Sequence, residues 1–146
     1  MAAITSSSDL IGSLKAGVGA GLIGGLAFGV MMGMMGMLPM VGMLVRVESA
    51  VVGFIVHMLI SATIGAVYSQ AAVRLPQGWG VAAVAGAVNG IVWWVLGALI
   101  LMPLMLGMSQ MVFVIGEMQW MSLLGHLIFG VIAGLAFVPL HQRFAA

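Results

Sequence analysis

The chain has 146 residues, of which 64% are hydrophobic and only 5% are charged, and its formal net charge is +1. Soluble domains carry roughly 25% charged residues, so this chain has too few polar side chains to cover a surface in water, and we expect it to lie in a lipid bilayer. The small net charge gives no reason to expect a nucleic acid as a partner. The lack of cysteine excludes disulfides, thiolate metal sites and a cysteine nucleophile.

Four apolar segments are long enough to cross a bilayer, which takes about 20 residues. In chain order we expect membrane-spanning helices over 15–38, 50–72, 80–102 and 119–140. Pro39 and Pro103 are expected to end the first and the third helix, because proline lacks the N–H that a helix interior needs. The apolar runs are continuous rather than alternating, which favours helices over a membrane barrel. The expected fold class is an all-α integral membrane protein with four transmembrane helices.

The few charges predict the orientation of these helices. One side of the membrane receives Lys15, Arg74 and Arg143, and the other receives Arg46, Glu48 and Glu117. The positive-inside rule then places both termini in the cytoplasm, and we expect the inner or plasma membrane of a prokaryote. The first residues contain Asp9 and no basic start, which does not fit a signal peptide.

The sequence also repeats itself. A shift of 65 pairs the first span with the third, and a shift of 69 pairs the second with the fourth, with four extra residues between Met108 and Glu117. The pairs include Gly21 with Gly86, Gly25 with Gly90, Glu48 with Glu117, His57 with His126 and Gly65 with Gly134. The single membrane domain, 1–146, is therefore expected to consist of two parallel tandem two-helix repeats, 15–70 and 80–141, related by a two-fold axis along the membrane normal.

Under this symmetry His57 and His126 share a depth near the bilayer centre, about 13 Å below the two glutamates. Small residues lie four positions away on the same helix face: Gly53 and Ser61 for the first histidine, Ser122 and Gly130 for the second. Such a strip leaves a shallow groove for a flat macrocycle, so these six residues are the candidate site for haem b or a chlorophyll-type pigment.

Close helix packing is the alternative interpretation of the same residues. Small residues four apart let helices approach each other, and an interior histidine can hydrogen-bond a neighbouring helix, for example through Ser61, Thr63 or Asn89. Glu48 and Glu117 lie at helix starts, where the helix dipole favours negative charge. Nine residues turn a helix through about 900°, so each glutamate points away from its own histidine.

Methionines recur every third residue over 31–43 and over 102–111. Thioethers are soft ligands that suit Cu(I). A three-residue step advances about 300°, so successive methionines drift around the helix and no single face holds them all. Methionine as a flexible filler of apolar gaps is the better interpretation.

No nucleotide-binding loop, catalytic triad or metalloprotease motif occurs, so an independent enzyme is not expected. The preferred hypothesis is a small structural subunit of a larger, energy-transducing membrane complex, which holds a haem or a pigment if the histidines are ligands. One alternative is a small transporter or channel for a metal ion, with the outer glutamates above the histidine pair. Another is a ligand-free packing protein that forms homo-oligomers through its glycine faces. The expected partners are the lipid bilayer and other membrane subunits, or a second copy.

Overall fold

The computed structural model describes residues 7–144, which form nine helical segments and no strand. The segments are α1 (Ser7–Met34), α2 (Leu38–Gly42), the 3-10 turn η1 (Met43–Val45), α3 (Ala50–Ala72), α4 (Trp79–Trp93), the π-helix η2 (Trp94–Leu101), α5 (Met102–Met105), the 3-10 turn η3 (Ser109–Met111) and α6 (Glu117–Phe144). Four stretches are long and apolar enough to cross a membrane, namely Asp9–Met34, Ala50–Ala72, Trp79–Met105 and Glu117–Phe144. The expected all-α membrane protein with four spans is confirmed.

Pro39 does not end the first span, contrary to expectation. α1 already ends at Met34, and the chain turns at Gly36, whose φ of 68° lies in the left-handed region that favours glycine. The N–H of Met37 donates to the carbonyl oxygen of Met32 over 2.9 Å, which closes the helix end. Pro39 instead lies in the first turn of α2, where its missing N–H has little cost. The stop signal is therefore the glycine and not the proline.

Pro103 does not end the third span either, because the helix continues through it to Met105. In a regular α-helix the carbonyl of Leu99 would accept a hydrogen bond from residue 103, which has no N–H. The helix is widened to a π-helix over Trp94–Leu101. The Leu99 carbonyl oxygen accepts from the N–H of Phe113, in the loop that follows, over 3.2 Å. The proline thus redirects one backbone hydrogen bond instead of breaking the helix.

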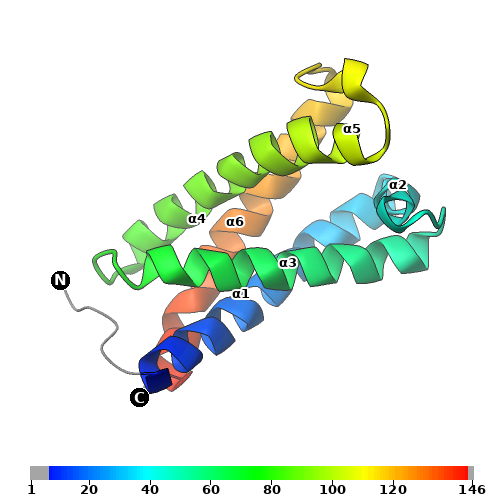
Figure 1. Ribbon diagram of the computed structural model, residues 1–146. Coiled ribbons are helices and arrows are strands. Elements are labelled where there is room, and N and C mark those ends of the chain that lie inside the picture. Colours follow the sequence, from blue (N-terminus) through cyan, green and yellow to red (C-terminus); the bar gives the residue numbers. More distant parts are fainter. Residues whose placement is uncertain (1–6, 145–146) are drawn as a thin grey trace.

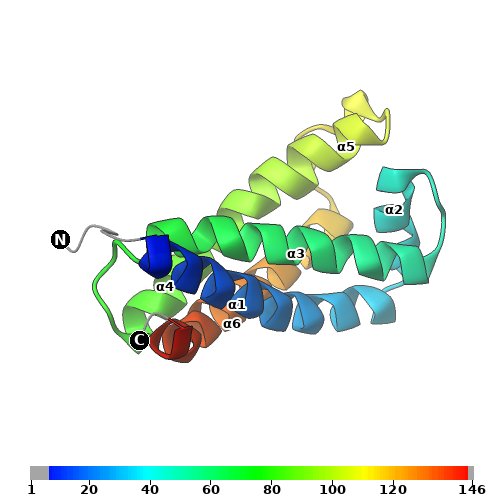
Figure 2. The same ribbon diagram turned by 60° about the horizontal axis from the view of Figure 1, so that its bottom comes forward.

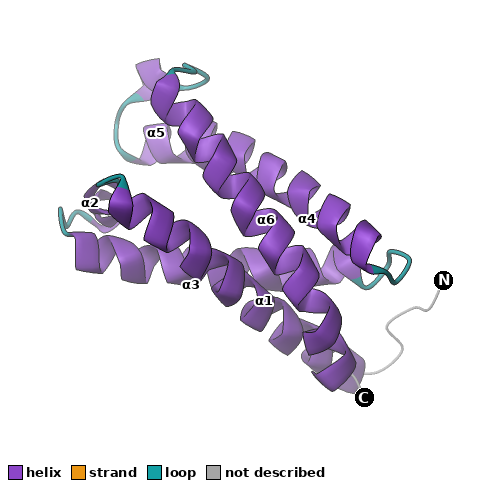
Figure 3. Cartoon of the chain, turned by 180° about the vertical axis from the view of Figure 1, so that it is seen from behind, coloured by secondary structure: helices purple, strands orange, loops and turns teal. Residues whose placement is uncertain are grey.

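α1 and α6 are the central helices of the bundle. α1 packs against α3 and α6, and α6 packs against α1 and α4, whereas α3 and α4 have very little contact. The ends of the described chain and the α3–α4 connection lie at one end of the molecule, and α2 and α5 lie at the other (Figures 1 and 3). Two long hairpins, α1–α3 and α4–α6, are therefore joined through their α1 and α6 helices.

The backbones of the paired helices touch at glycines within each hairpin. A Cβ atom on Gly65 of α3 would collide with the Gly17 carbonyl oxygen of α1, and a Cβ atom on Gly134 of α6 would collide with the Ala82 carbonyl oxygen of α4. The shifts of 65 and 69 pair these same positions, so the two hairpins make matching contacts at equivalent residues. The rotation axis that relates the hairpins, and its direction relative to the membrane normal, stays a prediction.

The connections within the two hairpins differ. In the first, α2 packs against α3 and buries Leu38 and Val41. In the second, α5 and the loop after it lie away from α2, at the far end of their own hairpin (Figure 2), and Phe113, Val114 and Ile115 are exposed. The four extra residues of the second copy therefore fall in a loop, where an insertion leaves the helix packing unchanged.

Candidate functional site

His57 joins α3 to α1. Its side chain is buried, and its Nε2–H donates to the carbonyl oxygen of Gly25 over 2.8 Å. The hydroxyl oxygen of Ser61, one helical turn further along α3, lies 3.4 Å from the same nitrogen. A nitrogen that carries this proton cannot at the same time bind a metal. His57 therefore acts in this structure as an interhelical hydrogen-bond donor, and Ser61 rather than Asn89 or Thr63 is its side-chain neighbour.

His126 has a different hydrogen-bond pattern. Its Nδ1–H donates to the carbonyl oxygen of Ser122, on its own helix, over 2.7 Å, and the Ser122 hydroxyl oxygen lies 3.4 Å from the same nitrogen. Residues 7–144 provide no hydrogen bond to its Nε2. The two histidines are equivalent in the sequence, but only His57 links two helices.

Phe28 of α1 contacts both imidazole rings. Its ring centroid lies 5.4 Å from that of His57 and 4.9 Å from that of His126, with edge-type geometry in both cases. A Cβ atom on Gly125 would collide with this ring, so the glycine provides the space that Phe28 fills. A haem held by both histidines would need the place of the Phe28 ring, and the geometry does not favour such a ligand.

The small residues beside the histidines are covered by other helices. Gly53 lies against the Leu38 carbonyl of α2, Ser61 lies against α1, and Gly130 lies against the Gly86 carbonyl of α4. Ser122 is buried beside His126. The strips are therefore helix-packing faces and leave no open groove for a flat macrocycle.

The glutamates and methionines do not gather into a site in the part of the chain that the structure describes. Glu48 and Glu117 are both exposed. Within residues 7–144 no three His, Asp or Glu side chains are grouped closely enough to hold a metal ion. Met32 is 4% exposed and Met34 is 84% exposed, which fits a flexible filler spread around the helix rather than one row of thioethers.

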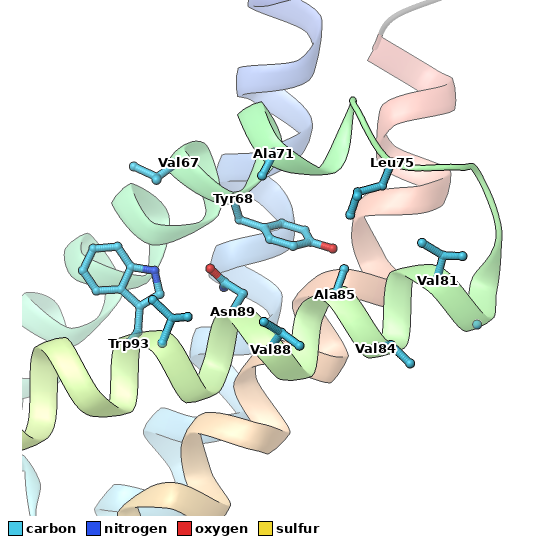
Figure 4. Close-up of a pocket in the computed structure, with 12 residues that line it drawn as sticks. Val67, Tyr68, Ala71, Leu75, Val81, Val84, Ala85, Val88, Asn89 and Trp93 are labelled. Atoms are coloured by element: carbon cyan, nitrogen blue, oxygen red, sulfur yellow. The ribbon is translucent and has the colours of Figure 1, made fainter. Parts of the chain in front are cut away.

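A groove lies between α3 and α4, and the sequence interpretation missed it. Its volume is about 730 Å³. Valine and alanine side chains from the two helices line it, together with Tyr68, Asn89 and Trp93 and with Leu75 from the α3–α4 connection (Figure 4). We refer to it as the α3–α4 groove. It lies at the place where the first helix of one hairpin meets the second helix of the other, as α1 meets α6 on the opposite side.

The α1–α6 contact shows what the α3–α4 groove lacks. A Cβ atom on Gly24 of α1 would collide with the Phe129 carbonyl of α6, so these two backbones touch. The Phe28 ring of α1 lies in the space above Gly125 of α6. One glycine on each helix therefore allows the close approach.

Larger residues occupy the equivalent positions of α3 and α4. The shift of 65 places Asn89 at the position of Gly24 and Trp93 at that of Phe28. The shift of 69 places Val56 of α3 at the position of Gly125. Asn89 and Trp93 line the groove, whereas Val56 packs against the buried core around Phe28. The two contacts therefore differ in the size of the residues at equivalent positions, which can be recognised in the sequence once the helix neighbours are known.

Asn89 provides a side-chain amide to the groove lining, which also contains the Tyr68 hydroxyl and the Trp93 indole. Its amide points between Tyr68 and Trp93 (Figure 4), and no hydrogen bond to it is formed within residues 7–144. Tyr68 is buried, with its ring against Phe137 at a centroid distance of 5.8 Å. An unpaired amide inside a bilayer is costly, so this groove suits an apolar body that brings a hydrogen-bonding group.

Comparison of the chain with protein-family models, curated protein sequences and solved structures finds no match in any of the three.

Proposed function

We propose that the protein is a small structural subunit of a membrane assembly and that its α3–α4 groove receives a transmembrane helix of a partner. The observation that supports this is the contrast between two equivalent helix pairs, of which α1–α6 is packed and α3–α4 is open. Membrane helices associate through close packing and interhelical hydrogen bonds, since burial from water contributes nothing between them. The groove offers both kinds of interaction.

The lining of the groove fits a helix better than it fits a polar substrate. Ala71 and Ala85 give it a floor of small side chains, over which a neighbouring helix can approach closely. Asn89 supplies one hydrogen-bonding group, and no charged side chain lines the groove. A helix with an apolar face and one polar residue satisfies all of these features.

A haem or a chlorophyll-type pigment is not part of this proposal. The Phe28 ring lies against both His57 and His126, and Gly53 and Gly130 are covered by backbone from other helices. The histidine pair is better explained by helix packing, in which His57 bonds the Gly25 carbonyl.

Photo-cross-linking in the native membrane tests the proposal. A photo-reactive amino acid replaces Val67, which lines the groove and is 54% exposed, and in a matched variant it replaces Val51, which lies on the same helix and is 71% exposed. The two positions are 16 residues apart, so they point to nearly opposite sides of α3. We expect protein adducts from position 67 and lipid adducts from position 51. Lipid adducts alone from both positions would contradict the proposal.

A further inference from the structure

The length of the α3–α4 groove suits a transmembrane helix. Along α4 the groove runs from Gly80 to Trp93, a length of about 20 Å at about 1.5 Å per residue. Its volume of about 730 Å³ offers space for the side chains of a neighbouring helix. One helix can therefore lie along the groove with lipid on its outer side.

Asn89 determines what that helix must carry. A side-chain amide both donates and accepts hydrogen bonds, and within residues 7–144 the Asn89 amide has no partner. The groove lining contains no charged residue. The complementary helix is thus uncharged along this face and presents a group that donates and accepts at the depth of Asn89.

A second copy of this chain meets these conditions. Two copies with the same membrane topology are related by an axis along the membrane normal, so equivalent residues lie at the same depth. Asn89 of the second copy is then level with Asn89 of the first, and two amides can pair with each other. α4 also exposes Val81, Val84 and Val88, whose spacing of three and four residues forms a ridge that can pack over small side chains.

We infer that two copies of this chain form a two-fold dimer in which α4 of each copy lies in the α3–α4 groove of the other and the two Asn89 amides bond across the axis. This inference rests on the proposed function, because it names the partner of the same groove. Each α4 then contacts the α3 of the other copy, so that the contact missing within the chain is made between chains.

Disulfide cross-linking of the full chain in membranes tests the dimer directly, because the natural sequence contains no cysteine. Val88→Cys places one thiol in the groove next to Asn89, and Val30→Cys places one on the lipid-facing side of α1, where the valine is 55% exposed. We expect oxidation to convert most of the Val88→Cys protein to a dimer of twice the chain mass and little of the Val30→Cys protein. Equal dimer yields for the two variants would overturn the inference.

A second measurement follows the dimer equilibrium in lipid vesicles by energy transfer between labelled copies. Asn89→Leu is expected to raise the dissociation constant about 3- to 20-fold, the range for one interhelical hydrogen bond in a membrane, and Asn89→Gln to restore most of the affinity. Val67→Trp fills the groove and is expected to abolish energy transfer, whereas Val51→Trp leaves it unchanged. No effect of either groove variant would overturn the inference.

The outcomes separate this inference from the proposed function. A cross-link from position 67 to a different membrane protein, with Val88→Cys giving no homodimer, overturns the inference that the partner is a second copy. The proposed function as a structural subunit then still stands. Lipid adducts alone from position 67, with no homodimer, overturn both. A homodimer that depends on Asn89 supports both.

Discussion

Between α1 and α6 a glycine lets two helix backbones touch, whereas between α3 and α4 an asparagine occupies the equivalent position and the helices stay apart. Gly24 and Asn89 are paired by the shift of 65, and each hairpin makes a close backbone contact at its own glycine, Gly65 or Gly134. An internal repeat therefore does not impose equal packing on its copies. A few side chains at the interface decide which of two equivalent contacts closes.

The closed contact joins the hairpins, and the open one is the surface that we propose for a partner. Helix association in a membrane depends on how closely backbones approach. The glycines of α1 and α6 are used within the chain, while Ala71, Ala85 and Asn89 are left at the groove. Variants at paired positions can therefore test the two roles against each other.

The largest expected effect is that of Gly24→Leu. Its side chain collides with the Phe129 carbonyl, and we expect the free energy of unfolding to fall by about 3 kcal/mol or more. The matched change Asn89→Leu, at the equivalent position of the open contact, should cost less than about 1 kcal/mol in the monomer. Unfolding in mixed detergent micelles measures both. Equal losses would show that the two contacts do not differ as described.

A smaller difference is expected for the aromatic pair Phe28 and Trp93. Phe28 is 6% exposed and fills the space above Gly125, so Phe28→Ala should lower the free energy of unfolding by about 3 kcal/mol. Trp93 is only partly buried, and Trp93→Ala should cost about 1–2 kcal/mol. Thermal denaturation in the same detergent compares the two. A larger loss for Trp93→Ala than for Phe28→Ala would contradict the account, because the α3–α4 side would then be the more tightly packed one.

The histidines should show the smallest difference of this kind. His57→Leu leaves the Gly25 carbonyl of another helix without its donor and should cost about 1–2 kcal/mol. His126→Leu removes a bond to its own helix and should cost less than about 1 kcal/mol. The measurement is again unfolding in micelles, with absorbance of the purified protein as a second readout. A Soret-type absorbance band that His126→Leu removes would contradict a purely structural role.

The helices themselves were predictable from the sequence, because the absence of charges over about 20 residues is a strong and local signal. The expected span 50–72 coincides with α3, Ala50–Ala72. The helix ends at the two prolines were predicted wrongly. A proline is accommodated in the first turn of a helix, and the left-handed φ of Gly36 and the hydrogen bond from Phe113 to Leu99 depend on how the following loop folds.

The candidate site was less predictable, because it depends on which helices become neighbours. Spacing along one helix placed His57 near Ser61, and the structure has them 3.4 Å apart. Spacing could not indicate that the ring of Phe28 lies against both histidines, since α1 is distant from α6 in the sequence. The groove was missed for the same reason. The difference between Gly24 and its equivalent Asn89 can be interpreted only when the α1–α6 contact is known.

Label distances across the two contacts test the central claim most directly. Ile23 and Ala136 flank the α1–α6 contact, and Val88 and Val67 are their equivalents at the α3–α4 groove by the shifts of 65 and 69. Each pair is replaced by two cysteines, spin-labelled, and measured by pulsed electron resonance in lipid nanodiscs that hold one copy. We predict a clearly longer distance for the 67–88 pair than for the 23–136 pair. Equal distances would mean that α3 and α4 are packed as closely as α1 and α6, and that no groove exists for a partner.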